Sequence, residues 1–230
     1  MNQVYLDNAA TTSLDPEVIK VMSDCMRDVY GNPSSSHNFG RKSRSVIEES
    51  RRKIANQLNA ESSEIFFTSG GTEADNMAIR GAVRDGGVKH IITSKIEHPA
   101  VLNTVNHLRL KKKIIVSYVN IDKKGIIDLS HLEQLLSKND HVLVSLMHGN
   151  NEIGNLLNLE SVSMLCSNYN ALFHSDTVQT IGHYNFDLKN IKIDFLACSA
   201  HKFHGPKGIG FLYINKDINI TPLIHGGSQE

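Results

Sequence analysis

Residues 194–214 read DFLACSAHKFHGPKGIGFLYI, two apolar runs separated by a turn rich in glycine, histidine and lysine. Each run is short and almost continuously apolar, which is typical of a strand buried on both faces of a sheet. The turn places two histidines and two lysines directly after the first of these strands. We therefore expect two core strands here, with a chemically capable turn between them.

Five further runs have the same character and predict five more strands: EIFFTS (64–69), HIITS (90–94), IIVSYV (114–119), HVLVSLM (141–147) and ALFHS (171–175). Helical patterns lie among them, at residues 36–58, 72–85, 99–110 and 158–170. Strands that alternate with helices indicate an α/β fold. The sequence predicts a mostly parallel, seven-stranded sheet covered by helices.

Composition excludes some classes of protein. The chain has 230 residues, with 24 Lys and Arg against 24 Asp and Glu. This balance argues against direct nucleic-acid binding, which usually needs a basic excess. There is no run of 18 apolar residues and no signal-peptide pattern, so we expect a cytoplasmic protein without membrane contact. Cys25, Cys166 and Cys198 are few and widely spaced, and we expect buried, unpaired side chains.

Polar residues follow five of the seven predicted strands. Ligands of parallel sheets collect at the carboxyl ends of the strands, so these five exits together predict a site. The exits are Ser69-Gly70-Gly71-Thr72, Glu97-His98, His148-Gly149-Asn150-Asn151, His174-Ser175-Asp176 and Ser199-Ala200-His201-Lys202.

The first exit, within TSGGTEADN (68–76), leads through two glycines into a helix, which suits a phosphate. An ordinary strand-to-helix turn capped by Thr72 explains the same residues equally well. Asp176 could bind a metal, act as a base, pair with a cationic ring nitrogen or cap a turn. A metal is disfavoured because His174 and Asp176 have no third ligand at a recognised spacing, and we predict no metal site.

Lys202 directly follows a strand, beside the predicted positions of Asp176 and the glycine turn. A partly desolvated lysine there can form a Schiff base with an aldehyde. Lys207 lies in a Pro/Gly turn that faces solvent or a phosphate. A phosphate cradle, a carboxylate for a pyridinium nitrogen and a lysine for an aldehyde together predict pyridoxal 5′-phosphate as the cofactor.

Ordered motifs along nearly the whole chain carry a family resemblance: YLDNAATT, GNPSSSH, FTSGGTEADN, ITSKIEH, MHGNNEIG, HSDTVQTIG, SAHKFHGPKGIGFLY and HGGSQE. With these motifs the sequence resembles the cysteine desulfurases of the NifS/IscS type, in the class V group of pyridoxal-phosphate enzymes. It departs from the family pattern at Gly149, Ala200 and Ser228, and none of these departures removes a functional group.

The resemblance implies a role for each site residue. Lys202 would hold the cofactor and move protons at the substrate Cα, and Asp176 would pair with the pyridine nitrogen. Gln179 would bond the ring hydroxyl, His98 would lie over the ring and assist proton transfer, and Asn151 would meet the ring or the substrate carboxylate. Four residues would hold the phosphate: Gly71, Thr72, Ser199 and His201.

The resemblance also implies an activity, in which sulfur leaves L-cysteine to give L-alanine and a persulfide on an enzyme cysteine. In the family, a small domain and the nucleophilic cysteine follow HGGxQE. None of Cys25, Cys166 and Cys198 matches the motif of that nucleophilic cysteine. We therefore expect residues 1–230 to form the large cofactor-binding domain of fold-type I enzymes without the small C-terminal domain. Residues 1–15 would be an arm that packs on that domain.

Several alternatives stay open at this level. The chain could be a fragment, half of a split gene product or a truncated, non-catalytic cofactor-binding protein. Another class V activity, selenocysteine lyase or aminotransferase, is a second alternative, although MHGNNEIG and HGGSQE favour the desulfurase. The family further implies a homodimer and a sulfur-acceptor protein that serves iron–sulfur cluster assembly or tRNA thiolation.

Overall fold

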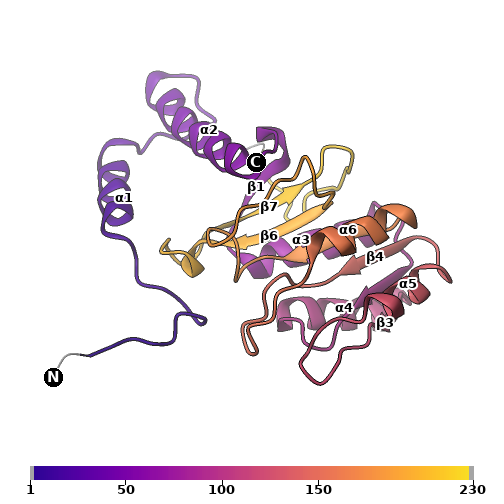
Figure 1. Cartoon of the computed structure of the whole chain (residues 1–230). Coiled ribbons are helices and arrows are strands. Elements are labelled where there is room, and N and C mark those ends of the chain that lie inside the picture. Colours follow the sequence, from indigo (N-terminus) through magenta and orange to yellow (C-terminus); the bar gives the residue numbers. More distant parts are fainter. Residues whose placement is uncertain (1–2, 228–230) are drawn as a thin grey trace.

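The computed structural model describes residues 3–227. Ser228 and the rest of the HGGSQE motif beyond Gly227 lie outside the described residues. At the centre is one seven-stranded sheet with the order β1-β7-β6-β5-β4-β2-β3 (Figure 1). Its strands are β1 (Ile65–Thr68), β2 (His90–Thr93), β3 (Ile115–Tyr118), β4 (Val142–Ser145), β5 (Leu172–Asp176), β6 (Phe195–Ser199) and β7 (Gly210–Ile214).

All seven predicted strands are confirmed, each within a few residues of its expected ends. The sheet is mostly parallel, as predicted, but β7 runs antiparallel to both of its neighbours, β6 and β1. The short connection after β6 explains why β7 runs antiparallel. It contains only one turn of 3-10 helix, Ala200–Lys202, and a parallel return would need a longer crossover. The turn that carries Lys202 is thus the loop of a hairpin.

Helices cover both faces of the sheet. Their bounds are α1 (Pro16–Asp28), α2 (Asn38–Leu58), α3 (Gly71–Arg84), α4 (Pro99–Lys112), α5 (Leu129–Leu136) and α6 (Leu159–Asn168), and a 3-10 turn spans Ser62–Glu64. Apolar side chains of α3 and α4 pack on one face, and those of α2, α5 and α6 pack on the other. Because both faces are buried, β2, β4, β6 and β7 are buried along their full length.

Two helices, α1 and α5, have no counterpart among the predicted segments. Helix α1 starts in a regular way, since Asp15 caps it by accepting the Glu17 N–H at 2.7 Å, yet none of its residues is buried. It lies away from the sheet together with the N-terminal segment (Figure 1). The prediction that all three cysteines are buried is therefore wrong for Cys25, which is half-buried on this helix, and holds for Cys166 and Cys198.

Within residues 3–227 there is no helix that combines the length and the apolar character needed to cross a membrane.

Candidate cofactor site

A cavity of about 660 Å³ opens at the carboxyl ends of the parallel strands. This is the edge at which the sequence predicted a site. All nine predicted site residues line the cavity: Gly71, Thr72, His98, Asn151, Asp176, Gln179, Ser199, His201 and Lys202. They come from positions far apart in the chain, and the sheet brings them together.

The loop between β1 and α3 forms one wall. Gly70 caps α3 with a φ of 146° and a ψ of −174°, a backbone conformation that glycine adopts without strain. Since Gly70 has no side chain, it does not satisfy the first N–H groups of α3, at Gly71 and Thr72. These groups and the positive end of the helix dipole meet the cavity, and Ser199 lies beside them.

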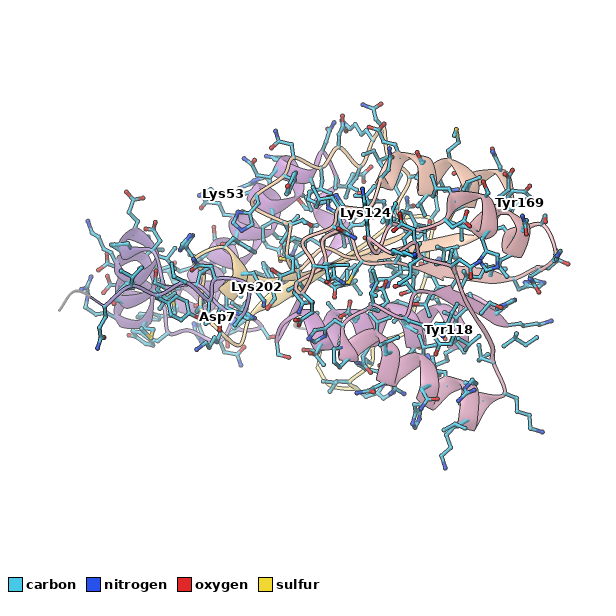
Figure 2. All side chains as sticks on the ribbon, turned by 60° about the horizontal axis from the view of Figure 1, so that its bottom comes forward. Asp7, Lys53, Tyr118, Lys124, Tyr169 and Lys202 are labelled. Carbon is cyan, nitrogen blue, oxygen red and sulfur yellow. The ribbon has the colours of Figure 1, made fainter. Side chains whose placement is uncertain are left out.

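Lys202 lines the same cavity. Its Nζ donates to the carbonyl oxygens of Ala10, at 3.0 Å, and of Ala9. Burial lowers the pKa of Lys202 below the ordinary lysine value, while the negative charges of Asp176 and Asp7 act in the opposite direction. Figure 2 shows Asp7 and Lys202 next to each other. A lysine with a lowered pKa is more readily neutral, which is the nucleophilic form of the amine.

Asp176 ends β5 and is buried. Its Oδ1 accepts the Val178 N–H at 2.9 Å. Burial raises the pKa of Asp176 to about 7, and Asp75 adds to this, whereas the Val178 N–H, His174 and His98 lower it. A cationic group placed against Asp176 would favour its ionised form.

His98 caps helix α4, and this contact fixes the state of its ring. The Ala100 N–H donates to Nδ1 at 3.1 Å. Nδ1 is therefore an acceptor, and in the neutral ring the proton is on Nε2.

The N-terminal segment completes the wall around Lys202, which sequence reasoning missed. Gln179, expected to bond a ring hydroxyl, donates its Nε2 to Ala9 O at 2.9 Å. His201, expected at a phosphate, has its Nδ1 3.0 Å from Thr11 Oγ1. The Thr12 N–H donates to His201 O at 2.9 Å. No local pattern predicts these contacts, because they join residues 170 to 190 positions apart.

Two buried carboxyl groups under the site were also not assigned a role from the sequence. Asp75 of α3 lines the cavity and is almost fully buried. Glu97 accepts the Ser94 hydroxyl at 2.6 Å and the Met147 N–H at 2.8 Å. Burial is the main reason that the pKa of Glu97 is raised to about 8. Asp75 lies in the motif TSGGTEADN, and Glu97 lies in ITSKIEH.

Asn151, expected at the ring or at a substrate carboxylate, lines the cavity and donates its Nδ2 to Glu152 at 2.6 Å. In the described part of the chain there is no cluster of three or more His, Cys, Asp or Glu side chains suited to a metal ion. Burial raises the thiol pKa of Cys166 and of Cys198, so neither is a ready nucleophile.

The donor set suits a small aldehyde cofactor that carries a phosphate and a basic ring nitrogen. Free N–H groups at α3 match a phosphate, the amine of Lys202 matches an aldehyde, and Asp176 matches a protonated ring nitrogen. The backbone is packed closely here: a Cβ on Gly210 would lie 2.9 Å from Gly70 Cα. The cradle around the phosphate position is therefore held by main-chain contact.

Fold and site together define an α/β domain with a lysine-centred cofactor cavity. The family model described as aminotransferase class-V matches residues 4–229, and the chain belongs to that family. Within it, the chain is similar to proteins named as cysteine desulfurases, as its motifs predicted. It is 49% identical to "Cysteine desulfurase IscS" of Dictyoglomus turgidum over 99% of this chain and 58% of that protein. It is 45% identical to "Putative cysteine desulfurase IscS 1" of Bacillus subtilis, over 100% of this chain and 61% of that protein.

Solved structures agree with this fold. A protein described as "NIFS-LIKE PROTEIN" superposes with a TM-score of 0.94 at 42% identity, over 99% of this chain and 63% of the other. A second structure, "SspA in complex with cysteine", gives a TM-score of 0.92 at 35% identity, over 99% and 66% of the two chains. These matches confirm the α/β prediction. The chain spans about three-fifths of the length of the curated relatives it matches.

Proposed function

We propose that this chain is the cofactor-binding part of a pyridoxal-phosphate-dependent cysteine desulfurase. The observation that carries the proposal is the convergence of Lys202, Asp176 and the free N-terminus of α3 in one cavity. The relatives named as cysteine desulfurases support the activity, and the neighbour described in complex with cysteine supports the substrate.

Pyridoxal phosphate, when bound, supplies an electron sink that weakens bonds at the substrate Cα. Lys202 would hold the aldehyde through Nζ and would hold or move a proton at Cα. Asp176 would pair with the ring nitrogen and stabilise its protonated form. His98 presents its Nε2–H toward the cavity, since Nδ1 is engaged by Ala100. The first N–H groups of α3, with Ser199 and His201, bind the phosphate.

The sulfur acceptor within the enzyme is proposed to be none of the three cysteines of this chain. Cys166 and Cys198 are buried with raised thiol pKa values, and Cys25 sits on α1, which takes no part in the cavity. A homodimer, a cytoplasmic location and a partner protein that receives sulfur for iron–sulfur assembly or tRNA thiolation stay predictions of the family resemblance.

The test is to map the cofactor lysine. The chain is incubated with pyridoxal phosphate, reduced with borohydride and digested for mass spectrometry. The adduct is expected on Lys202 and should vanish in Lys202→Arg. Lys207 lines the same cavity and serves as the internal control. An adduct on Lys207 in place of Lys202, or no adduct, would overturn the assignment.

A second assay tests the substrate. L-Cysteine is expected to change the visible absorbance of the loaded chain, and L-alanine release is expected only when a segment that carries the acceptor cysteine is supplied. L-Serine, which has a hydroxyl in place of the thiol, is the matched control for sulfur specificity. A serine response equal to that of cysteine would count against a desulfurase.

A further inference from the structure

Beneath the cavity, β5 and α3 bury a group of ionisable side chains. Residues alternate between the faces of a strand, so His174 and Asp176 project from β5 to the same face. This face packs on α3, and Asp75 of α3 is only 1% exposed. His174 is fully buried and Asp176 is 5% exposed. Two largely buried carboxyl groups therefore lie close to one imidazole at the floor of the cavity.

Asp75 and His174 contact each other at one end of this group. Asp75 Oδ1 lies 3.3 Å from His174 Nε2, and within residues 3–227 neither atom makes a hydrogen bond of regular geometry. The other ring nitrogen, Nδ1, lies 2.8 Å from the hydroxyl of Ser145, which is its register partner on β4. Burial raises the pKa of Asp75 well above its ordinary value and lowers that of His174 to about 4. Both shifts favour the uncharged forms.

Asp176 differs from Asp75 in its partners. It accepts the Val178 N–H at 2.9 Å, and the charges of His174 and His98 also lower its pKa. Asp176 in turn raises the pKa of Lys202, whereas burial alone acts on the pKa of Asp75. A carboxylate with an N–H donor and nearby positive groups is better stabilised than one without them. The two carboxyl groups are therefore unequal.

We propose that Asp75 and His174 form a net-neutral pair in which the Asp75 carboxyl donates its proton to Nε2, so that Asp176 alone carries the charge that faces the cofactor. The inference rests on the proposed function, because it assigns these two residues a positioning role toward the cofactor. In this arrangement Nδ1–H donates to Ser145 Oγ, and every polar atom of the ring is satisfied.

The other ionisable groups that face this pair fit the same assignment. Glu97, from the loop after β2, has its pKa raised mainly by burial and further by Asp176 and Asp75. His98, at the start of α4, acts on Asp176 in the opposite direction. If Asp75 were ionised beside Asp176, two buried negative charges would repel each other without an adjacent buried cation. A neutral pair removes this repulsion.

The first test needs no cofactor. Histidine labelled with nitrogen-15 is incorporated into the whole chain, and the ring signals of His174 are identified by their loss in His174→Gln. The expected spectrum is a neutral ring with the proton on Nδ1, unchanged between about pH 6 and 9. A proton on Nε2 alone would mean that Asp75 is ionised, and a titration of His174 in this range would mean that the pair changes charge. Either result would overturn the proposal.

The second test compares the same substitution at the two carboxyl groups. Asp176→Asn removes a real charge, so the midpoint of the pH titration of the bound cofactor's visible absorbance should fall. Asp75→Asn replaces one neutral donor by another and should leave the midpoint in place. A fall in Asp75→Asn as large as in Asp176→Asn would overturn the proposal.

The two tests also separate the two proposals. If wild-type protein shows no cofactor absorbance, the proposed function fails, and the nitrogen-15 spectrum still decides the state of the pair. If Asp75→Asn does not fold, the wild-type spectrum again decides. Asp75→Leu, which cannot donate to Nε2, is expected to shift the His174 signals, whereas Asp75→Asn preserves them.

Discussion

The ε-amine of Lys202 lies 3.0 Å from the carbonyl oxygen of Ala10, a residue 192 positions earlier in the chain. The same amine donates to Ala9 O, and Gln179 donates to that oxygen as well. The segment that bears these carbonyls is tied down by Thr12, whose N–H and hydroxyl both bond His201 O. Main-chain oxygens thus orient the lysine.

Asp7 should tune the pKa of Lys202. The negative charge of Asp7 raises the pKa of Lys202, whereas burial of the lysine lowers this pKa by more. In Asp7→Asn we expect the pKa of Lys202 to fall further, because one of the negative charges that oppose the effect of burial is removed. The measurement is the pH dependence of Lys202 acylation by an amine-reactive anhydride, read by peptide mass spectrometry. Asp24→Asn, on the distant α1, is the control, and an upward shift in Asp7→Asn would contradict this reading.

His98 should have two separable roles, one as the cap of α4 and one as a ring in the cavity. His98→Asn retains a capping acceptor, so its free energy of unfolding should stay within about 0.5 kcal/mol of wild type. His98→Ala lacks a cap and should lose about 1 kcal/mol. Both variants should lose the cysteine-induced absorbance change. Denaturant unfolding measures the stability of both variants, and spectroscopy measures their response to cysteine. If His98→Asn still responds to cysteine, the His98 ring takes no part in the reaction.

Glu97 should make stability fall with pH. Burial raises its folded pKa to about 8, above the ordinary value of 4.5, so the folded chain binds the proton more tightly than the unfolded chain. The stabilisation is fully present below about pH 4.5 and is lost as the pH rises through 8. Glu97→Gln should flatten the decline by about 1.4 kcal/mol per pH unit within that window. Urea unfolding at several pH values measures the dependence of the unfolding free energy on pH, and Glu160→Gln, at an exposed position, is the control. The same dependence in wild type, Glu97→Gln and Glu160→Gln would contradict the raised pKa of Glu97.

Gly210 should tolerate no side chain. It pairs with Ser199 on β6 and Thr68 on β1, and an added Cβ would collide with Cys198 O and lie 2.9 Å from Gly70 Cα. Because backbone atoms cannot move aside cheaply, Gly210→Ala should cost about 2–4 kcal/mol of unfolding free energy and weaken cofactor binding. Gly226→Ala meets open space and is the matched control. Equal thermal unfolding of the two variants would show that the sheet adapts.

The sequence predicted every strand because each is a short apolar run between turns, and it predicted the cavity because its residues sit at strand ends. It did not predict the direction of β7, since the apolar run GIGFLYI looks the same in either direction. The contacts of Ala9 and Ala10 with Lys202, and the burial of Asp75 against His174, depend on tertiary neighbours that no local pattern records. Helix α1 was missed because its apolar residues find no core within the described chain.

The edge position of β1 has a consequence for the order of assembly. Within the sheet β1 is hydrogen-bonded to β7 alone, and Ile65 pairs with Tyr213. During synthesis, β1 and the glycine loop after it emerge early, yet they have no strand to join until residues 210–214 have left the ribosome. The lysine turn between β6 and β7 is sequence-local and can form as a hairpin first. The glycine loop after β1 and Lys202 therefore meet in a late folding step, so a nascent chain has no complete cavity until β1 has paired with β7.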